Sequence, residues 1–328
     1  MKRSKTNVAA DNIVLGFSLA LIVLTICCGD ASIRSGAYLC AAVCVAAIIV
    51  PFVRDRSERT AIRVIYILYI MPALYLLYPT AIGLAKALHS HDFDPALIAI
   101  DRFLFGGVDP TRWISEYLHP PPMLVEVLQV CYFSHYLFPL ILGAELAWCG
   151  RIVELEKYRT IMVYGAVLSF IGNMIVPAIG PRITLLEFAD LQRVLPGVWV
   201  TNTLRGWINS GEGLQATMTS AEAMRTAFRD AFPSGHTMFT VMTILVAFQL
   251  RARVRWIIVL LGSGLICATL LLHYHYVIDV LAGVAGAVFV VWSVPAVTRS
   301  IGSIPIWWPG KASTRPELFP SHKSQASH

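Results

Sequence analysis

Eight apolar stretches, separated by polar connectors, constrain the fold of this chain more than any other feature. A membrane-spanning helix needs about 20 predominantly apolar residues. By that measure the candidate spans are 13–28, 36–53, 65–85, 123–148, 158–179, 234–250, 256–272 and 276–294. Only 14% of the 328 residues are charged, against roughly 25% in a soluble domain. The sequence therefore predicts an all-α polytopic membrane protein with about eight transmembrane helices.

Two long segments, 86–122 and 180–233, interrupt the series of apolar stretches. Gly, Pro and Trp are frequent in both, which is typical of folded loops or of helices that lie in the membrane interface. The last stretch, 301–328, is rich in Pro, Ser and Lys, a composition that favours disorder. We therefore expect a single transmembrane helical domain over residues 1–300, followed by a disordered tail.

The basic residues predict which side of the membrane each end faces. Eight spans place both termini on one side, and most of the 26 Lys and Arg residues lie on that side, at the termini or in its connectors. The connector 251–255, Arg-Ala-Arg-Val-Arg, is the clearest case. Connectors rich in Lys and Arg stay in the cytoplasm. We expect an integral protein of the bacterial inner membrane with cytoplasmic termini and tail, and with both long loops facing the periplasm or exterior. The net charge of +6 then reflects these flanks and not a nucleic-acid partner.

The first polar motif, Phe232-Pro-Ser-Gly-His236, opens an apolar stretch. Proline suits the first turn of a helix, and Ser234 and Gly235 would leave backbone N–H groups free for an anion. Helix N-termini commonly bind phosphate. His236 lies within the same turn, where it could protonate a leaving oxygen. The alternative, a helix cap with an interfacial histidine, has equal weight for the motif taken alone.

The second polar motif pairs His275 with Asp279 at the start of the last apolar stretch. Four residues apart on a helix, the two side chains would share one face. A carboxylate bonded to one ring nitrogen fixes the tautomer and raises the basicity of the other nitrogen, which makes the imidazole a nucleophile. His273 would lie on another face, as an interfacial residue or one that supports the site. The alternative is an ion pair that only joins helices.

The predicted topology places both motifs on one face of the membrane, together with Arg182 at the outer end of the fifth span. A guanidinium binds phosphate well, although an interfacial arginine can also serve only to contact lipid head groups. Arg229 is a further candidate upstream of Pro233. Tyr132 and His135 on the fourth span either contribute to the site or bond helices together.

These motifs resemble a known family. Pro233-Ser-Gly-His236 and His275-x-x-x-Asp279 are similar to the second and third signature motifs of the type 2 phosphatidic acid phosphatase superfamily. The segments 101–110 and 132–139 resemble its bacterial branch related to inositol phosphorylceramide synthases. The resemblance implies a six-helix catalytic core and a metal-independent reaction through a phosphohistidine, without a cofactor. His275 would be the nucleophile, Asp279 its partner, and His236 the acid and later the base.

The sequence departs from the family pattern at two places. In the first motif, Lys followed after six residues by Arg-Pro, Ile175 stands at the lysine and Gly180-Pro-Arg182 reverses the order. In the third, Ala268 and Thr269 replace the usual Ser-Arg. Loss of these cations resembles the sphingomyelin and inositol phosphorylceramide synthases, which transfer a phospho-head group to a lipid alcohol.

Three classes of function therefore remain. The first is a membrane phosphoesterase that removes phosphate from a lipid-linked phosphate, and the second is a phosphotransferase that delivers the phospho-group to a lipid alcohol. Both take membrane lipids as partners. The third is a transporter or scaffold, because intramembrane His and Asp also line proton paths. Three ligands could also hold a zinc ion, but no further ligand cluster supports a metal site.

Overall fold

The computed structural model describes residues 8–29, 31–56 and 60–301, and this part of the chain forms helices without any β-strand. The predicted all-α fold is confirmed. The long helices are α1 (Ala9–Cys28), α3 (Gly36–Arg56), α5 (Ile70–Leu88), α8 (Pro122–Phe133), α9 (Phe138–Trp148), α10 (Ile152–Ile175), α15 (Gly235–Gln249), α16 (Arg255–Leu271) and α17 (Val277–Ile301). The tail predicted over 301–328 lies outside the described residues from 302 onward.

Shorter helices occupy the connectors and the two long segments. They are α2 (Ala31–Arg34), α4 (Thr60–Leu68), α6 (Asp94–Leu104), α7 (Pro110–Tyr117), η1 (Ser134–Tyr136), α11 (Pro181–Thr184), η2 (Phe188–Asp190), α12 (Leu191–Val194), α13 (Thr201–Gly211) and α14 (Ser220–Thr226). The segments 86–122 and 180–233 therefore contain short helices.

Each predicted apolar stretch corresponds to a helix, but the helices differ in their capacity to cross a membrane. Within the described ranges, four continuous helices are long and apolar enough: Ala9–Cys28, Gly36–Arg54, Ile65–Leu88 and Val277–Ile301. A fifth is the pair α8–α9, which is bent by 53° at the η1 turn. Helices α15 and α16 are apolar but shorter, and α10 has 24 residues but carries charged residues near its start. The eight predicted spans therefore include three, α10, α15 and α16, that do not meet these criteria of length and apolar composition.

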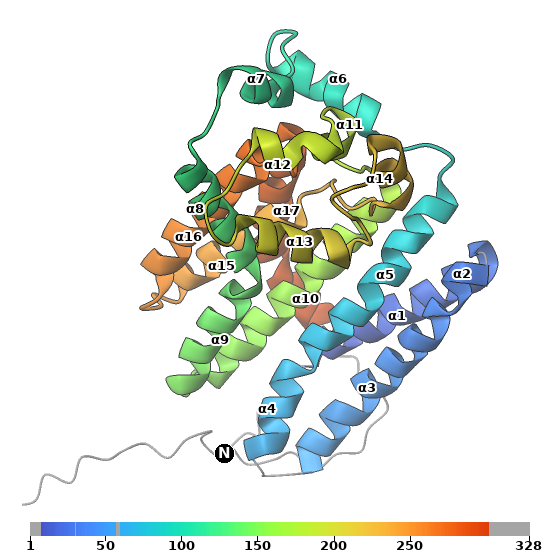
Figure 1. Ribbon diagram of the computed structural model, residues 1–328. Helices are drawn as coiled ribbons and strands as arrows, with labels where there is room; N and C mark the ends of the chain where they lie inside the picture. The colour runs from blue at the N-terminus through green and yellow to red at the C-terminus, as the bar shows by residue number, and fades with distance from the viewer. Residues whose placement is uncertain (1–7, 30, 57–59, 302–328) are drawn as a thin grey trace, which may run out of the picture.

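The two polar motifs lie within a core of six helical units: α5, the bent pair α8–α9, α10, α15, α16 and α17. Helix α15 packs between α16 and α17, α10 packs on α5, α15 and α17, and α8 packs on α16. The buried apolar side chains of α9, α10, α15, α16 and α17 form one cluster. Helices α1 and α3 add a flank against α5 and α10 (Figure 1). A buried ion pair between Asp11 on α1 and Arg159 on α10 fixes that flank to the core.

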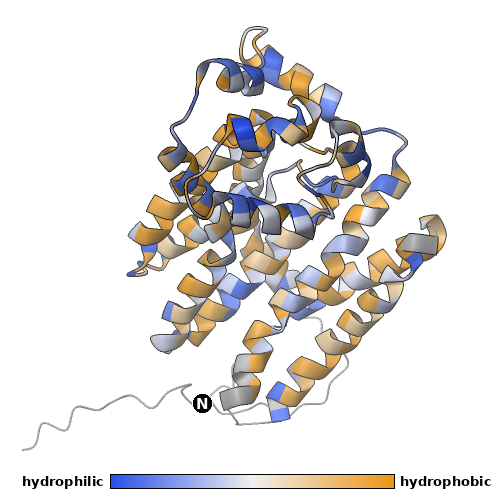
Figure 2. Cartoon of the chain, viewed as in Figure 1, coloured by the Kyte–Doolittle hydropathy of each residue, from blue (hydrophilic) through white to orange (hydrophobic). Residues whose placement is uncertain are grey.

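The first and last helices meet at one end of the bundle. The Asn12 side chain on α1 donates a hydrogen bond of 2.9 Å to the carbonyl of Ile301 at the end of α17. Helices α6, α7, α11, α12 and α14 lie toward the opposite end (Figure 1). Figure 2 shows polar residues mixed with apolar ones in these loop helices, whereas the long helices are mostly apolar. If the chain crosses the membrane an even number of times, the start of α1 and the end of α17 are expected on the same side, and the two are in contact here.

Candidate active site

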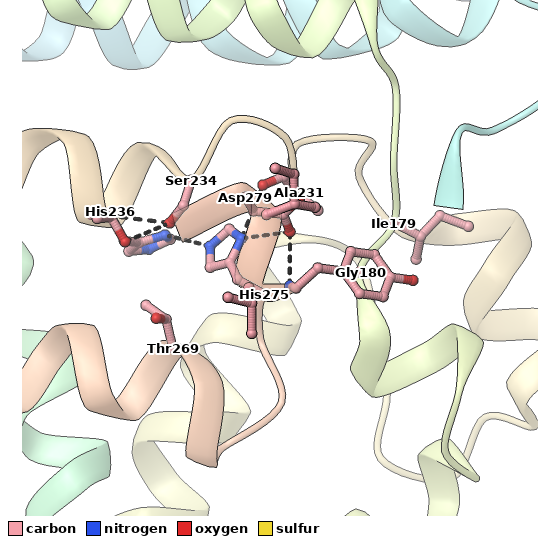
Figure 3. Close-up of polar contacts among 12 residues, drawn as sticks. Ile179, Gly180, Ala231, Ser234, His236, Thr269, His275 and Asp279 are labelled. Carbon is pink, nitrogen blue, oxygen red and sulfur yellow. Dashed lines mark hydrogen bonds and ion pairs between the residues drawn. The ribbon is translucent and has the colours of Figure 1, made fainter. Parts of the chain in front are cut away.

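The two histidine motifs meet at the loop end of the core. The Nε2 atom of His275 lies 3.4 Å from Nδ1 of His236, although 39 residues separate them in the chain (Figure 3). His236 is in the first turn of α15, and His275 lies in the connector between α16 and α17. Packing of α15 against both of these helices therefore brings the two imidazoles together.

The start of α15 differs in one respect from the sequence prediction. Ser234 is the N-cap: its Oγ accepts the N–H of Thr237 at 3.3 Å, and its own N–H donates to the carbonyl of Asp279 at 3.0 Å. Pro233 therefore precedes the cap and is outside the first turn. Ser234 is fully buried, and its side chain and N–H take part in these bonds; its role in binding phosphate stays a prediction. The N–H groups of Gly235 and His236 form no such bonds within the described residues, and they are the groups open to an anion.

His275 is held by backbone and carboxylate groups on one side of its ring. Its Nδ1 lies 2.9 Å from the carbonyl of Ala231 and 3.5 Å from Oδ2 of Asp279. Both partners accept hydrogen bonds, so the proton belongs on Nδ1, and Nε2 presents its lone pair toward His236. Helix α17 begins only at Val277. His275 and Asp279 thus meet as predicted, but through a turn into the helix instead of through one helical face.

Asp279 also joins the two motifs. It is fully buried, and its Oδ2 accepts the N–H of Tyr276 at 2.9 Å. Its carbonyl receives the N–H of Ser234. One turn farther along α17, a Cβ at Gly283 would lie 2.7 Å from the carbonyl oxygen of Ser234. Glycine at 283 therefore allows the start of α15 to approach α17 closely enough for these bonds.

Burial sets the protonation of the nucleophile candidate. His275 is 5% exposed, and burial lowers the pKa of its imidazole to about 4, with a smaller contribution from the positive charge of Arg182. The imidazole is therefore neutral at pH 7, the form that can attack an electrophile.

Tyr132 and His135 contact His236 directly. The Tyr132 ring stacks on the His236 ring with centroids 4.6 Å apart, and its hydroxyl lies 3.5 Å from Nδ1. The His135 ring meets the His236 ring edge-on at 4.4 Å. His135 belongs to the η1 turn between α8 and α9, so the bend in this span carries both side chains to the site.

Arg182, on α11, is buried beside the histidines without touching them. It donates to Oδ1 of Asn209 at 2.9 Å and forms an ion pair with Glu212. Its Cζ atom lies 5.1 Å from the ring centroid of Tyr274, the residue before His275. The predicted cation is therefore close to the site, and its charge is already partly compensated by Glu212.

Arg229 and His273 do not join this group. Arg229 forms an ion pair with Asp92 at 3.1 Å and also donates to the carbonyls of Met224 and Ala227, so it braces the loops instead of facing the histidines. His273 has a φ of 60° and is 1% exposed, and its Nδ1 has no hydrogen-bond partner in the described part of the chain. It is therefore buried and not interfacial, because the tight turn after α16 directs it inward.

Carboxylates that the motif search did not select position the site. Asp101 accepts the N–H groups of Val277 and Ile278, both at 2.8 Å, and so caps α17. Asp94 accepts the N–H groups of Ile179 and Gly180 and the hydroxyl of Tyr276. Both come from α6 in the first long segment. The resemblance around 101–110 was the only signal in the sequence that pointed to this region.

No group of three or more His, Cys, Asp or Glu side chains in the described ranges is arranged to hold a metal ion.

Comparisons with proteins of curated function and with solved structures found no match. A family model described as the PAP2 superfamily matches residues 95–293. The matched stretch covers more than half of the chain and contains both histidine motifs. The protein therefore belongs to the PAP2 superfamily, whose members are generally phosphoesterases or phosphotransferases.

Proposed function

We propose that this protein removes phosphate from a lipid-linked phosphate through a phosphohistidine on His275. The observation that carries the proposal is the 3.4 Å approach of His275 Nε2 to His236 Nδ1. The N–H groups at the start of α15 bind the phosphate oxygens, and Nε2 attacks phosphorus. His236 protonates the departing lipid oxygen. Water, deprotonated by His236, then releases phosphate from His275.

Asp279 and the carbonyl of Ala231 have a positioning role in this scheme. By accepting the Nδ1 proton they fix the ring, and a negative carboxylate stabilises the positive charge that develops on the imidazole. Tyr132 and His135 orient His236, and Arg182 supports the bound phosphate electrostatically. None of these steps requires a metal ion.

The substrate side of the membrane follows from the charge distribution. The Arg-rich connector 251–255 lies at the end of the core opposite the histidines, between α15 and α16. If that connector is cytoplasmic, the active site faces the periplasm or exterior, and the lipid phosphate belongs to the outer leaflet of the inner membrane.

The second candidate is transfer of the phospho-group to a lipid alcohol, as in the enzymes related to inositol phosphorylceramide synthase. Two observations favour it. Thr269, fully buried, stands where the family usually has an arginine, and within the described residues its side chain donates only to the carbonyl of Ile266 in its own helix. His275 itself is nearly inaccessible, and exclusion of water favours an alcohol acceptor over hydrolysis.

The decisive experiment uses purified protein in detergent with a lipid phosphate carrying labelled phosphorus, with and without a lipid alcohol. Hydrolysis predicts labelled inorganic phosphate under both conditions. Transfer predicts a labelled lipid product only when the alcohol is present. Absence of either product over a broad panel of lipid phosphates, with protein shown to be folded, would favour the transporter or scaffold.

The lowered pKa of His275 predicts how activity depends on pH. The attacking imidazole must be neutral, and a pKa shifted from 6.5 to about 4 keeps it neutral as the pH falls through 6. We therefore expect the acidic limb of kcat/KM to lie well below 6.5, since this limb reports the essential base of the free enzyme. Two substrates whose phosphates differ in pKa serve as the control, because a limb that moves with the substrate belongs to the substrate. A limb at or above 6.5 for both would contradict the prediction.

A further inference from the structure

Helix α5 contacts the loop of the site through one tyrosine. The hydroxyl of Tyr78 donates a hydrogen bond to Oδ2 of Asp230, although 152 residues separate the two in the chain. Asp230 directly precedes Ala231, whose carbonyl accepts the Nδ1 proton of His275 at 2.9 Å (Figure 3). Helix α5 ends before residue 95, where the family match begins. A helix outside the matched stretch therefore reaches the backbone that orients the candidate nucleophile.

The Tyr78 side chain has a fixed direction. Its ring lies against Phe170 of α10 with centroids 5.3 Å apart, and it meets Phe228 edge-on at 5.8 Å. Helix α5 packs along α10, so the hydroxyl is held at the level of Asp230. Asp230 is half-buried, and no other described residue donates a hydrogen bond to its carboxylate or forms an ion pair with it. Without the hydroxyl of Tyr78, this carboxylate would be free to turn toward solvent.

The neighbours of Asp230 are anchored by other contacts. Arg229 forms its ion pair with Asp92, and the N–H of Ala231 donates to the carbonyl of Ala178 at 3.0 Å. These contacts fix the path of the loop. The direction of the Asp230 side chain, in contrast, depends on the tyrosine.

The charge of Asp230 acts on His275. Burial lowers the pKa of the His275 imidazole, and the negative charge of Asp230 is the largest effect that opposes burial. A carboxylate that stabilises the protonated ring also stabilises the positive charge that develops when Nε2 attacks phosphorus. Tyr78 is therefore connected to the reaction in two ways, by the carbonyl of Ala231 and by the carboxylate of Asp230.

We propose that Tyr78 is a positioning residue of the phosphoryl transfer and acts through Asp230. This inference rests on the proposed function. The bond from Nε2 of His275 to phosphorus forms while the bond from phosphorus to the lipid oxygen breaks, and that oxygen takes the proton of His236. The Nδ1 proton stays on the ring, bonded to the carbonyl of Ala231. Tyr78 exchanges no proton in this step: it holds Asp230 where its charge and the adjacent carbonyl face the ring.

The first test removes the hydroxyl alone. In Tyr78→Phe we expect kcat to fall at least about tenfold, with KM within about twofold, because a small displacement of a reacting group lowers the rate more than the binding. Tyr158→Phe is the matched control: it also removes a buried hydroxyl, the one that bonds Thr243 at 3.0 Å between α10 and α15, and it should leave kcat near the native value. A native kcat in Tyr78→Phe, or the same loss in both variants, would overturn the proposal.

The second test is a double-mutant cycle with Asp230→Ala. If the hydroxyl acts through the carboxylate, Asp230→Ala should lower kcat at least as much as Tyr78→Phe does. Adding Tyr78→Phe to Asp230→Ala should then lower kcat no further. Asp230→Asn, which can still accept the hydroxyl but has no charge, should fall between the native chain and Asp230→Ala. Losses that add in the double variant would show that the two residues act independently, and would overturn the assignment.

The third test needs no lipid. Phosphoramidate is a small phosphoryl donor: Nε2 of His275 takes the phosphoryl group and ammonia leaves. Mass spectrometry of the peptide that contains His275 should show that Tyr78→Phe is phosphorylated about tenfold more slowly than the native chain. Equal rates would overturn the positioning role. If the rates differ but the native chain turns over no lipid phosphate, the proposed function fails while the positioning role stands. Thermal unfolding shows whether each variant is folded.

Discussion

Replacing His275 with alanine is expected to lower kcat/KM by a factor of about 10⁴ or more, because the nucleophile of a covalent mechanism cannot be replaced by a neighbour. His236 faces Nε2 of His275 at 3.4 Å, but no carboxylate among the described residues contacts it as Asp279 contacts His275. The measurement is release or transfer of labelled phosphorus. Acid quenching should also trap labelled protein in the native chain and none in the His275→Ala variant.

The fold should survive this change. In His275→Ala the buried carbonyl of Ala231 loses the hydrogen bond from the imidazole, which costs about 1–3 kcal/mol. His273→Asn is a matched control: His273 is a buried histidine two residues away, and asparagine tolerates its positive φ. The control should retain most of the activity. A His275→Ala protein with more than a tenth of native activity would rule out the phosphohistidine.

The sequence predicted the residues at the centre of the site because they lie in two short local motifs. Pro233-Ser-Gly-His236 and His275-x-x-x-Asp279 each concentrate polar residues at the start of an apolar stretch, and counting two crossings between them placed both on one face. The structure brings His236, His275 and Asp279 together. Their roles remain predictions until the variants are measured.

The parts that the sequence did not predict depend on contacts between distant segments. Glu126 on α8 accepts N–H groups from Val198 to Thr201 and so caps α13, about 75 residues later in the chain. No local pattern distinguishes this glutamate from a surface one. The same holds for the pairing of Arg229 with Asp92, which only the packed loops reveal. The bonds of Ser234 were also not predicted: its hydroxyl caps α15 and its N–H donates to the carbonyl of Asp279 on α17.

The helices were predictable to the extent that apolar length determines them. All eight stretches are helical, yet hydropathy alone did not show that the fourth is bent at η1 or that α15 has only 15 residues. Both departures have a local cause. Ser134, His135 and the proline at 139 interrupt the α8–α9 span, and the N-cap at Ser234 fixes where α15 begins. Both departures lie where polar side chains enter the core.

Replacing Asp101 with asparagine tests whether a distant loop positions the nucleophile. The two oxygens of Asp101 accept the N–H groups of Val277 and Ile278 separately, and asparagine has only one oxygen to offer. One buried N–H then loses its partner, which lowers the free energy of unfolding by about 1–3 kcal/mol. Because His275 lies two residues before this cap, its ring should shift. A displacement of about 1 Å can lower a rate about 100-fold, so we expect kcat to fall by that order with little change in KM.

Glu145→Gln is the control that separates an effect on the position of the His275 ring from a general loss of folding stability. Glu145 accepts the N–H groups of Arg253 and Val254 at the start of α16, the same two-bond cap at the end of the core away from the histidines. It should also lose stability, although less than Asp101→Asn because its bond to the N–H of Arg253 is exposed, and it should keep kcat within a few-fold of the native value. If the two variants lower kcat equally, the loss in Asp101→Asn reflects weakened folding alone. If only Asp101→Asn lowers kcat, the first long segment sets the geometry of His275 from the loops, which would explain why the family match begins at residue 95 and not at the first histidine motif.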